Sequence, residues 1–409
     1  MYYASKLLKD AGLSDGLANT LGIYISVLLL ATVFLLLPIF TIWVERKVAA
    51  RFQNRVGPNR VGPFGILQSI PDVVKLLSKE LIFPRNVDRI PYMISPVLMV
   101  VSVIMMVAVV PLAPNIIGTD LSIGALYFVA ISSLSTIGVV MAGWGSNNKY
   151  ALLGAFRTVA QLISYEIPMV FTLLVPVMLA GTMSMQKIVD FQGDNYWIFF
   201  YAPTAFIIFI LSNLGEVGRS PFDLIEAESE LVAGFMIEYS AMAFAMFYLA
   251  EFLHAFLIGV FAATLFMGGW QGPFVQDLPV LGILYLSAKA FFIYFLTMWI
   301  RLTLPRFRID QMMAFNWKFL VPVSIVHLLI TGFLWKVLPE PEVTGNIFDR
   351  LFNGEALLRV GVMFLLSALV FVFSLRMLRN AILRGREATS AKLREAYPAA
   401  HAAAAPAGD

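Results

Sequence analysis

The sequence contains no cysteine, few charges and only three histidines. Without cysteine, the chain can form no disulfide and can supply no thiolate to an iron–sulfur cluster or a metal ion. Charged residues make up 13% of the chain, whereas soluble proteins contain about 25%. His254, His327 and His401 give little basis for haem or zinc ligation, and we predict no metal site. A soluble enzyme, a coiled coil and an intrinsically disordered chain are excluded.

Apolar residues dominate instead, at 59% of the chain, with a mean hydropathy of +0.81. A bilayer core about 30 Å thick requires roughly 20 apolar residues per helix. A transmembrane β-barrel would show alternating segments of about 10 residues. We therefore predict an all-α, polytopic transmembrane helical bundle with about nine spans. The predicted spans are 21–43, 92–113, 121–144, 150–180, 197–214, 231–268, 278–300, 317–335 and 356–375.

The basic residues predict the orientation of these spans. With the N-terminus outside and the C-terminus cytoplasmic, 22 of the 29 lysines and arginines fall on the cytoplasmic side, the positive-inside pattern. Splitting 231–268 into two spans would place the basic loop 301–316 outside, so we expect one long, tilted helix. Residues 1–380 are predicted to form a single membrane domain and 381–409 a disordered cytoplasmic tail. The first apolar run, near Leu21, has the full length of a span and does not resemble a cleavable signal peptide.

The loop after the first span contains the tetrapeptide RVGP twice, at 55–58 and 60–63. Each Gly-Pro pair predicts a turn. Residues 64–83 then carry apolar side chains at helical spacing and predict an amphipathic interfacial helix. Two interpretations remain open. The segment either anchors the chain to lipid phosphates through its arginines, or forms a lid over a cavity that a lipid-soluble molecule enters sideways.

The segment 215–231 is the most unusual part of the chain, because acidic residues accumulate beside apolar spans. It contains Glu216, Asp223, Glu226, Glu228 and Glu230 but only one base, Arg219. In a helix, Asp223, Glu226 and Glu230 would share one face. Glu238 and Glu251 follow in the next predicted span, with His254 one turn later. Glu166 lies in an earlier span, two residues before a kink expected at Pro168.

Carboxyl groups in and beside membrane spans indicate a role in proton transfer. A charged Asp at the centre of a membrane helix costs roughly 2.5–3.5 kcal/mol on insertion scales. Clustered carboxylates repel one another, which raises some of their pKa values towards neutrality, and the set titrates as a unit. Such a row suits a proton path. Simpler explanations are an ion pair with Lys289 or a solvated acidic loop. Carboxylates alone could also bind a metal, but no His or Cys supports that interpretation.

Four blocks together resemble the family of H subunits of the proton-pumping NADH:quinone oxidoreductase, respiratory complex I. They agree with that family in order and spacing, and the likeness runs from about residue 20 to 340. The blocks are WVERKVAARFQNRVGPNRVGPFGILQSIPD (43–72), RTVAQLISYEIP (157–168), EVGRSPFDLIEAESELVAGFMIEY (216–239) and WIRLTLPRFRIDQ (299–311). The ninth span fits the bacterial members, whereas the tail past about residue 380 is not part of the pattern.

The resemblance implies a membrane subunit of an enzyme that is a proton translocase. Such a subunit joins the membrane arm to the peripheral arm and forms most of the chamber that admits ubiquinone or menaquinone. Its partners would be the peripheral-arm subunits of the quinone module, adjacent small membrane-arm subunits, quinone and the lipid bilayer, with no nucleic acid. Iron–sulfur clusters, flavin and NADH would belong to partner subunits. The implied location is the bacterial inner (plasma) membrane, as a multi-pass protein.

The resemblance also assigns roles by position. Proton coupling falls to Glu166, Glu216, Asp223, Glu226, Glu228, Glu230, Glu238 and Glu251. The residues that would line the quinone chamber are Glu45, Arg46, Asp72, Arg157, Arg301 and Arg306. A chain without redox ligands must take electrons from a partner. The expected mechanism is therefore coupling: quinone reduction changes the charge in the chamber, and the acidic row passes the change to antiporter-like subunits.

Other functions remain as alternatives. A homologous membrane subunit of an energy-converting hydrogenase or of a ferredoxin-driven complex would share the fold and some of the glutamates. The intact double RVGP loop favours the quinone enzyme over the hydrogenase. A stand-alone proton or cation transporter would be expected to contain an inverted repeat, and none is visible. A purely structural scaffold would leave the cost of the membrane acids unexplained.

Overall fold

The computed structural model describes residues 9, 14–114, 116–223, 232–338 and 354–396. In the last helix, which begins at residue 354, side chains are described only for residues 354–380 and 383. Most of the described residues are helical and very few are in strands, which confirms the all-α fold. The α-helices are α2 (Asp15–Phe52), α3 (Ser69–Ser78), α4 (Arg89–Val107), α5 (Gly124–Gly145), α6 (Lys149–Ala180), α7 (Met185–Asp194), α8 (Ile198–Tyr201), α9 (Pro203–Val217), α11 (Ala241–Phe266), α12 (Val280–Thr303), α13 (Ile309–Phe315), α14 (Val321–Val337) and α16 (Gly354–Ala396). Between them lie the 3-10 helices η1 (Pro63–Gln68) and η2 (Gly234–Met236) and a π-helical turn, η3 (Asn316–Leu320). The strands β1 (Pro111–Ala113) and β2 (Ile116–Ile117) pair antiparallel, with Pro111 opposite Ile117.

Eight helical stretches within the described residues are long and apolar enough to cross a bilayer. They are α2, α4, α5, α6, α11, α12, the continuous stretch from α13 to α14, and α16 up to Asn380. The predicted span 197–214 is instead divided into α8 and α9, because Ala202 is not helical (φ −141°, ψ 63°) and Pro203 begins a new helix. At 15 residues α9 measures about 22 Å, shorter than the bilayer core.

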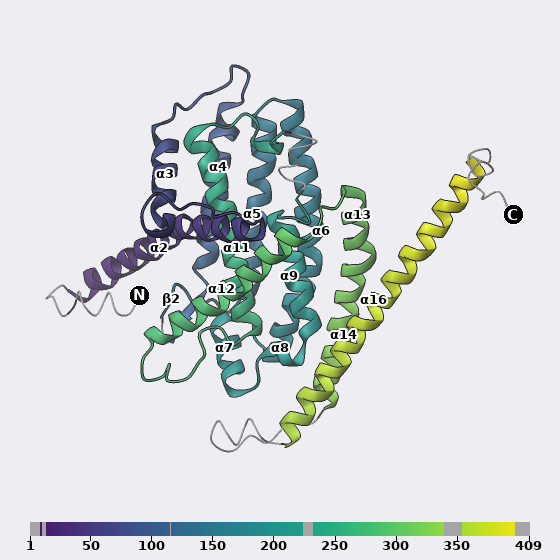
Figure 1. The fold of residues 1–409 in the computed structure, drawn as a ribbon. Helices are drawn as coiled ribbons and strands as arrows, with labels where there is room; N and C mark the ends of the chain where they lie inside the picture. The colour runs from purple at the N-terminus through teal and green to yellow at the C-terminus, as the bar shows by residue number, and fades with distance from the viewer. Residues whose placement is uncertain (1–8, 10–13, 115, 224–231, 339–353, 397–409) are drawn as a thin grey trace.

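The helices pack as a bundle that two tilted helices cross. Contacts run from α4 to α5, α5 to α6 and α6 to α9, while α11 packs against α4, α9 and α12. Figure 1 shows α4, α5, α6 and α9 side by side, with α2 and α12 running across them at a strong tilt. Helix α11 is the centre of the packing, since most of its length is buried. At 38 residues α2 is about 57 Å long, so tilt is needed to match it to a bilayer.

The segment before α11 differs from the prediction of a helix that starts at residue 231. The helix begins at Ala241, and 232–240 forms turns and the short helix η2. Val232 and Gly234 have positive φ angles (66° and 57°), which an α-helix does not allow. Asp223 is also outside a helix, so the predicted helical face of acids is not formed there; Glu226, Glu228 and Glu230 lie outside the described residues.

The amphipathic interfacial helix is present but shorter than the predicted 64–83. Phe64 and Gly65 have positive φ angles of 55° and 74°, so the α-helical part α3 starts only at Ser69 and ends before Lys79. Its apolar residues Ile70 and Leu77 are exposed in this chain. A helix with such a face suits the membrane interface or a partner subunit.

Lys289 does not pair with any carboxylate of the described residues, contrary to one of the simple explanations considered for the acidic segment. Its Nζ donates to the backbone carbonyls of Met267, Gly269 and Gln271, at 2.8, 3.0 and 2.9 Å, and lies 4.5 Å from the ring centre of Trp197. Carbonyls at the end of a helix carry partial negative charge, which favours a cation. Lys289 therefore secures the turn after α11 instead of compensating an acid.

The last helix, α16, is fixed by buried polar groups. Ser367 on α16 lies 2.9 Å from His327 Nε2 on α14, and its hydroxyl donates to Thr204 Oγ1 on α9 at 3.0 Å. Arg359, also buried, stacks on Trp335 and donates to its carbonyl oxygen at 2.8 Å. Figure 1 shows α16 beside α14 and continuing away from the bundle. It extends to Ala396, so the predicted tail is helical from 381 to 396, where helix-forming Ala, Leu, Arg and Glu are frequent.

Candidate functional site

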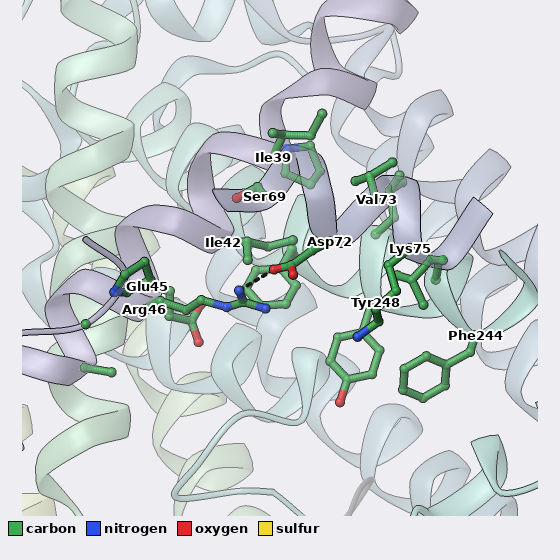
Figure 2. A pocket seen from close by; sticks show the side chains of 18 of the residues that line it. Ile39, Ile42, Glu45, Arg46, Ser69, Asp72, Val73, Lys75, Phe244 and Tyr248 are labelled. Atoms are coloured by element: carbon green, nitrogen blue, oxygen red, sulfur yellow. Dashed lines mark hydrogen bonds and ion pairs between the residues drawn. The ribbon is translucent and has the colours of Figure 1, made fainter. Parts of the chain in front are cut away.

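A cavity of about 880 Å³ opens between α2, α3, α11 and α12. Apolar side chains such as Ile39, Ile42 and Phe244 form much of its wall. Figure 2 shows charged side chains among them: Glu45 and Arg46 come from α2, and Asp72 and Lys75 from α3. The volume is within the range of about 300–1,000 Å³ that is usual for small-molecule pockets. An apolar cavity with a few charges suits a molecule with a lipophilic body and a polar head.

The RVGP loop positions α3 over this cavity. Gly57 and Gly62 have φ angles of 69° and 72°, the left-handed conformation that favours glycine. A Cβ atom on Gly57 would lie 2.9 Å from Ala50 Cβ, so the turn also packs too closely for a side chain. The loop returns the chain so that Asp72 on α3 accepts a hydrogen bond of 2.5 Å from Arg46 Nη1 on α2.

Glu45 connects three parts of the chain at the inner wall of the cavity. Its carboxylate pairs with Arg301 at the end of α12, and accepts from Arg219 Nη1 at 2.9 Å and from the Tyr294 hydroxyl at 3.0 Å. Arg219 is 4% exposed, and its Nε lies 3.6 Å from Glu251 Oε1 on α11. Arg219 is therefore shared between one carboxylate in the wall of the cavity and another deeper in the bundle.

The end of α9 sets the position of Arg219. Gly218 adopts the left-handed conformation (φ 68°) that ends the helix, and the amide of Arg219 donates back to Leu214 O at 3.3 Å. Gln161 Nε2 on α6 holds the next turn by donating to Gly215 O and Phe222 O, both at 2.7 Å. The helix end and this turn direct Arg219 towards α2 and α11.

A second, smaller cavity of about 50 Å³ lies behind Arg219. Glu216, Glu251 and His254 line it, and Glu216 is 5% exposed. His254 Nε2 lies 4.0 Å from Glu216 Oε1. Glu216 Oε2 is buried and has no hydrogen-bond partner among the described residues. Most of the other lining side chains are apolar. The volume has room for a few water molecules, since one requires about 10–15 Å³, and the two carboxyl groups can bind them.

Glu238 does not join this inner group. Its carboxylate accepts from Asn148 Nδ2 at 2.7 Å, beside a separate cavity of about 510 Å³ lined by polar residues. The stacked rings of Tyr92 and Tyr239, with centres 4.1 Å apart, pack next to it, and Phe247, which lines the inner cavity, contacts Tyr239. An aromatic layer thus separates Glu238 from Glu216 and Glu251.

The structure brings together only part of the predicted site. Of the predicted chamber residues, Glu45, Arg46, Asp72 and Arg301 line the large cavity, whereas Arg157 and Arg306 do not. Arg157 is half-buried on α6, and Arg306 is exposed in the loop after α12. Of the predicted proton-coupling residues, Glu216 and Glu251 share the inner cavity. Glu166, on α6, is near enough to Glu216 to affect it electrostatically.

Glu45 is contacted by Arg219 and Tyr294, and neither of these two residues was assigned a functional role from the sequence. A role for Arg219 could have been predicted from the sequence, because it is the single base within the acidic segment and buried carboxylates need a counter-charge. Tyr294 lies in an apolar run with no feature that distinguishes it from a packing residue.

Comparison with known proteins supports one family. The family model described as NADH dehydrogenase matches residues 25–332. The chain is 47% identical to the H subunit of NADH-quinone oxidoreductase from Dehalococcoides mccartyi over 302 residues, which cover 74% of this chain and 83% of that one. It is 44% identical to the H subunit from Paraburkholderia xenovorans over 330 residues, which cover 78% and 93% of the two chains. The chain therefore belongs to the NADH dehydrogenase family, which includes the H subunits of NADH-quinone oxidoreductases.

Proposed function

We propose that this chain forms the quinone-binding chamber of an NADH-quinone oxidoreductase and couples quinone reduction to proton translocation. The proposed location is the bacterial inner membrane, where the chain would contact the peripheral-arm and small membrane-arm subunits. Flavin, iron–sulfur clusters and the NADH site would belong to those partners. The chain itself has no cysteine. Its own contribution would be to bind quinone and to move charge.

The observation that carries this proposal is the line of charged groups between the two cavities. Arg301, Glu45, Arg219 and Glu251 follow one another at ion-pair distance from the large cavity to the small one. Reduction of quinone to quinol consumes two electrons from a partner and two protons. A change of charge beside Glu45 weakens or strengthens its pair with Arg219, because both are poorly solvated. When its pair with Glu45 weakens, Arg219 shifts its interaction towards Glu251.

Proton transfer would follow this shift of Arg219. When Arg219 moves towards Glu251, it stabilises the ionised form of that carboxylate, which releases a proton. Glu216 lines the same small cavity and can accept it through water. Glu216 Oε2 supports this role, because a buried oxygen without a partner among the described residues suits water.

The variant Glu216→Gln tests the proposal. It preserves the shape of the side chain but removes its ability to bind and release a proton. In proteoliposomes with the native assembly, we expect proton uptake coupled to quinone reduction to fall about tenfold or more. NADH oxidation by a soluble artificial acceptor should be unchanged, which checks assembly. The matched control is Asp277→Asn, at an exposed acid remote from both cavities.

Unchanged proton uptake in Glu216→Gln would remove this carboxyl group from the coupling path. A wild-type assembly without any NADH-dependent quinone reduction would instead favour the ferredoxin-driven or hydrogenase relatives. Loss of both activities in Glu216→Gln but not in Asp277→Asn would indicate a structural role for Glu216.

Replacing Gly57 with Ala should weaken quinone binding. The new Cβ would be strained at φ 69° and would lie 3.3 Å from Arg46 O, so the turn that holds α3 would shift. We expect the apparent KM for quinone to rise several-fold, with the artificial-acceptor activity unchanged. Gly16→Ala is the matched control, since nothing lies within 4 Å of a Cβ at that position. Equal KM values for the two variants would contradict a role of this turn in the chamber.

A further inference from the structure

The charges in the wall of the large cavity do not balance. Its lining includes four bases, Arg46, Arg55, Lys75 and Arg301, but only two acids, Glu45 and Asp72. Both acids already have cationic partners, since Asp72 pairs with Arg46, and Glu45 pairs with Arg301 and Arg219. Two positive charges are therefore left over in the lining of the cavity.

The two remaining cations are Arg55 and Lys75. Arg55 Nε donates at 2.7 Å to the neutral amide oxygen of Gln53, and neither residue forms an ion pair with a described acid. Figure 2 shows Lys75 with Phe244 and Tyr248, on the other side of the pocket from Glu45. A neutral quinone does not require this excess of positive charge. An anionic head group would be attracted to it.

The rest of the cavity suits an alkyl chain. Ile39, Ile42, Val73, Leu76 and Phe252 are apolar and line the same cavity as the two cations. The exposed apolar face of α3, which carries Lys75, favours a position at the membrane interface, where the head groups of amphiphiles lie. Burial of each CH₂ group contributes about 0.8 kcal/mol, so a chain of ten or more carbons adds substantial affinity.

We infer that this cavity binds a single-chain anionic amphiphile, namely a long-chain carboxylate. Its chain lies along the apolar wall and its carboxylate pairs with Lys75, while Arg55 adds to the positive charge of the cavity. Because the same cavity would bind quinone, the carboxylate competes with quinone and lowers turnover when it accumulates in the membrane. Only this competition rests on the proposed function; binding of the carboxylate does not.

Photolabelling of the native assembly tests the binding directly. The probes are a diazirine-bearing long-chain carboxylate and the alcohol of the same chain, which differ only in the head group. We expect the carboxylate to label peptides of α2, α3 or α11, and labelling to fall about tenfold in the double variant Arg55→Gln/Lys75→Gln. The loss of two partly screened charge interactions is of this size. Labelling by the alcohol should be weak and the same in both proteins.

Lys79→Gln is the control, because Lys79 follows α3 but does not line the cavity. Equal labelling by carboxylate and alcohol, or a Lys79→Gln effect as large as that of the double variant, would overturn the inference. A kinetic experiment separates it from the proposed function. Dodecanoate should raise the apparent KM for quinone in wild type but not in the double variant, whereas dodecanol should act on both alike. Specific labelling without any quinone reduction would support the carboxylate site and contradict the quinone chamber.

Discussion

Replacing Arg219 with Gln should abolish quinone reduction and reduce the stability of the assembly. Arg219 is buried and is shared by Glu45 and Glu251, at 2.9 and 3.6 Å. Removal of one member of a buried ion pair typically costs about 3–5 kcal/mol, since the remaining charge stays buried without its partner. Thermal unfolding of the detergent-solubilised complex and native gels would measure the loss. Arg219→Lys should be milder, because it keeps the charge but not the guanidinium geometry.

Arg308→Gln provides the control for this experiment. Arg308 pairs with Asp310 at 3.9 Å, and both side chains are largely exposed, so the pair contributes little. If Arg219→Gln assembled and reduced quinone as well as Arg308→Gln does, the charged line between the two cavities would have no functional importance.

The second large effect concerns the aromatic layer beside Glu238. Because the chain has no cysteine, a single introduced cysteine can be followed without interference from other thiols of this chain. Glu238→Cys should react with a charged, membrane-impermeant thiol reagent at least about tenfold faster than Val139→Cys. Val139 is buried and lines the inner cavity, whereas Glu238 lines the open polar one. A reagent with a fixed charge is excluded from a closed apolar environment.

Removing the aromatic layer should reduce this difference in labelling rate. Adding Tyr239→Ala to Val139→Cys deletes one ring of the stack with Tyr92 and should increase the labelling rate at position 139. Adding Phe274→Ala, at an exposed aromatic residue elsewhere, should leave it unchanged. Similar rates for Val139→Cys and Glu238→Cys in the absence of Tyr239→Ala would show that the two cavities communicate freely.

Much of the fold could be predicted because membrane helices need long apolar runs, and composition alone reveals these. The errors arose where backbone geometry overrides composition. The break at Ala202 and Pro203 divides one apolar run, and the positive φ angles of Val232 and Gly234 delay the start of α11. Pro203 and Gly234 are residue types that often interrupt helices, but Ala202 and Val232 are not, so the positions of these breaks could not be predicted.

The candidate site could be predicted less completely, because sequence proximity does not specify spatial proximity. Glu45 and Arg301 are far apart in the sequence yet pair in the structure. Glu238, in contrast, belongs to the acidic segment of the sequence but is separated from Glu216 by packed aromatic rings. The acidic row predicted from the sequence therefore divides into an inner group and a residue at an open cavity.

The polar contacts of α16 have a consequence for biosynthesis. Thr204 and His327 lie on α9 and α14, which the ribosome delivers before Ser367. Until α16 inserts, these two buried polar groups lack their partner in the interior of the bundle, where unsatisfied polar groups are costly. Helix α16, which is synthesised after α9 and α14, thus completes the hydrogen bonding of these earlier helices. Nascent chains that stop before α16 should be recognised as incomplete by membrane quality-control proteases.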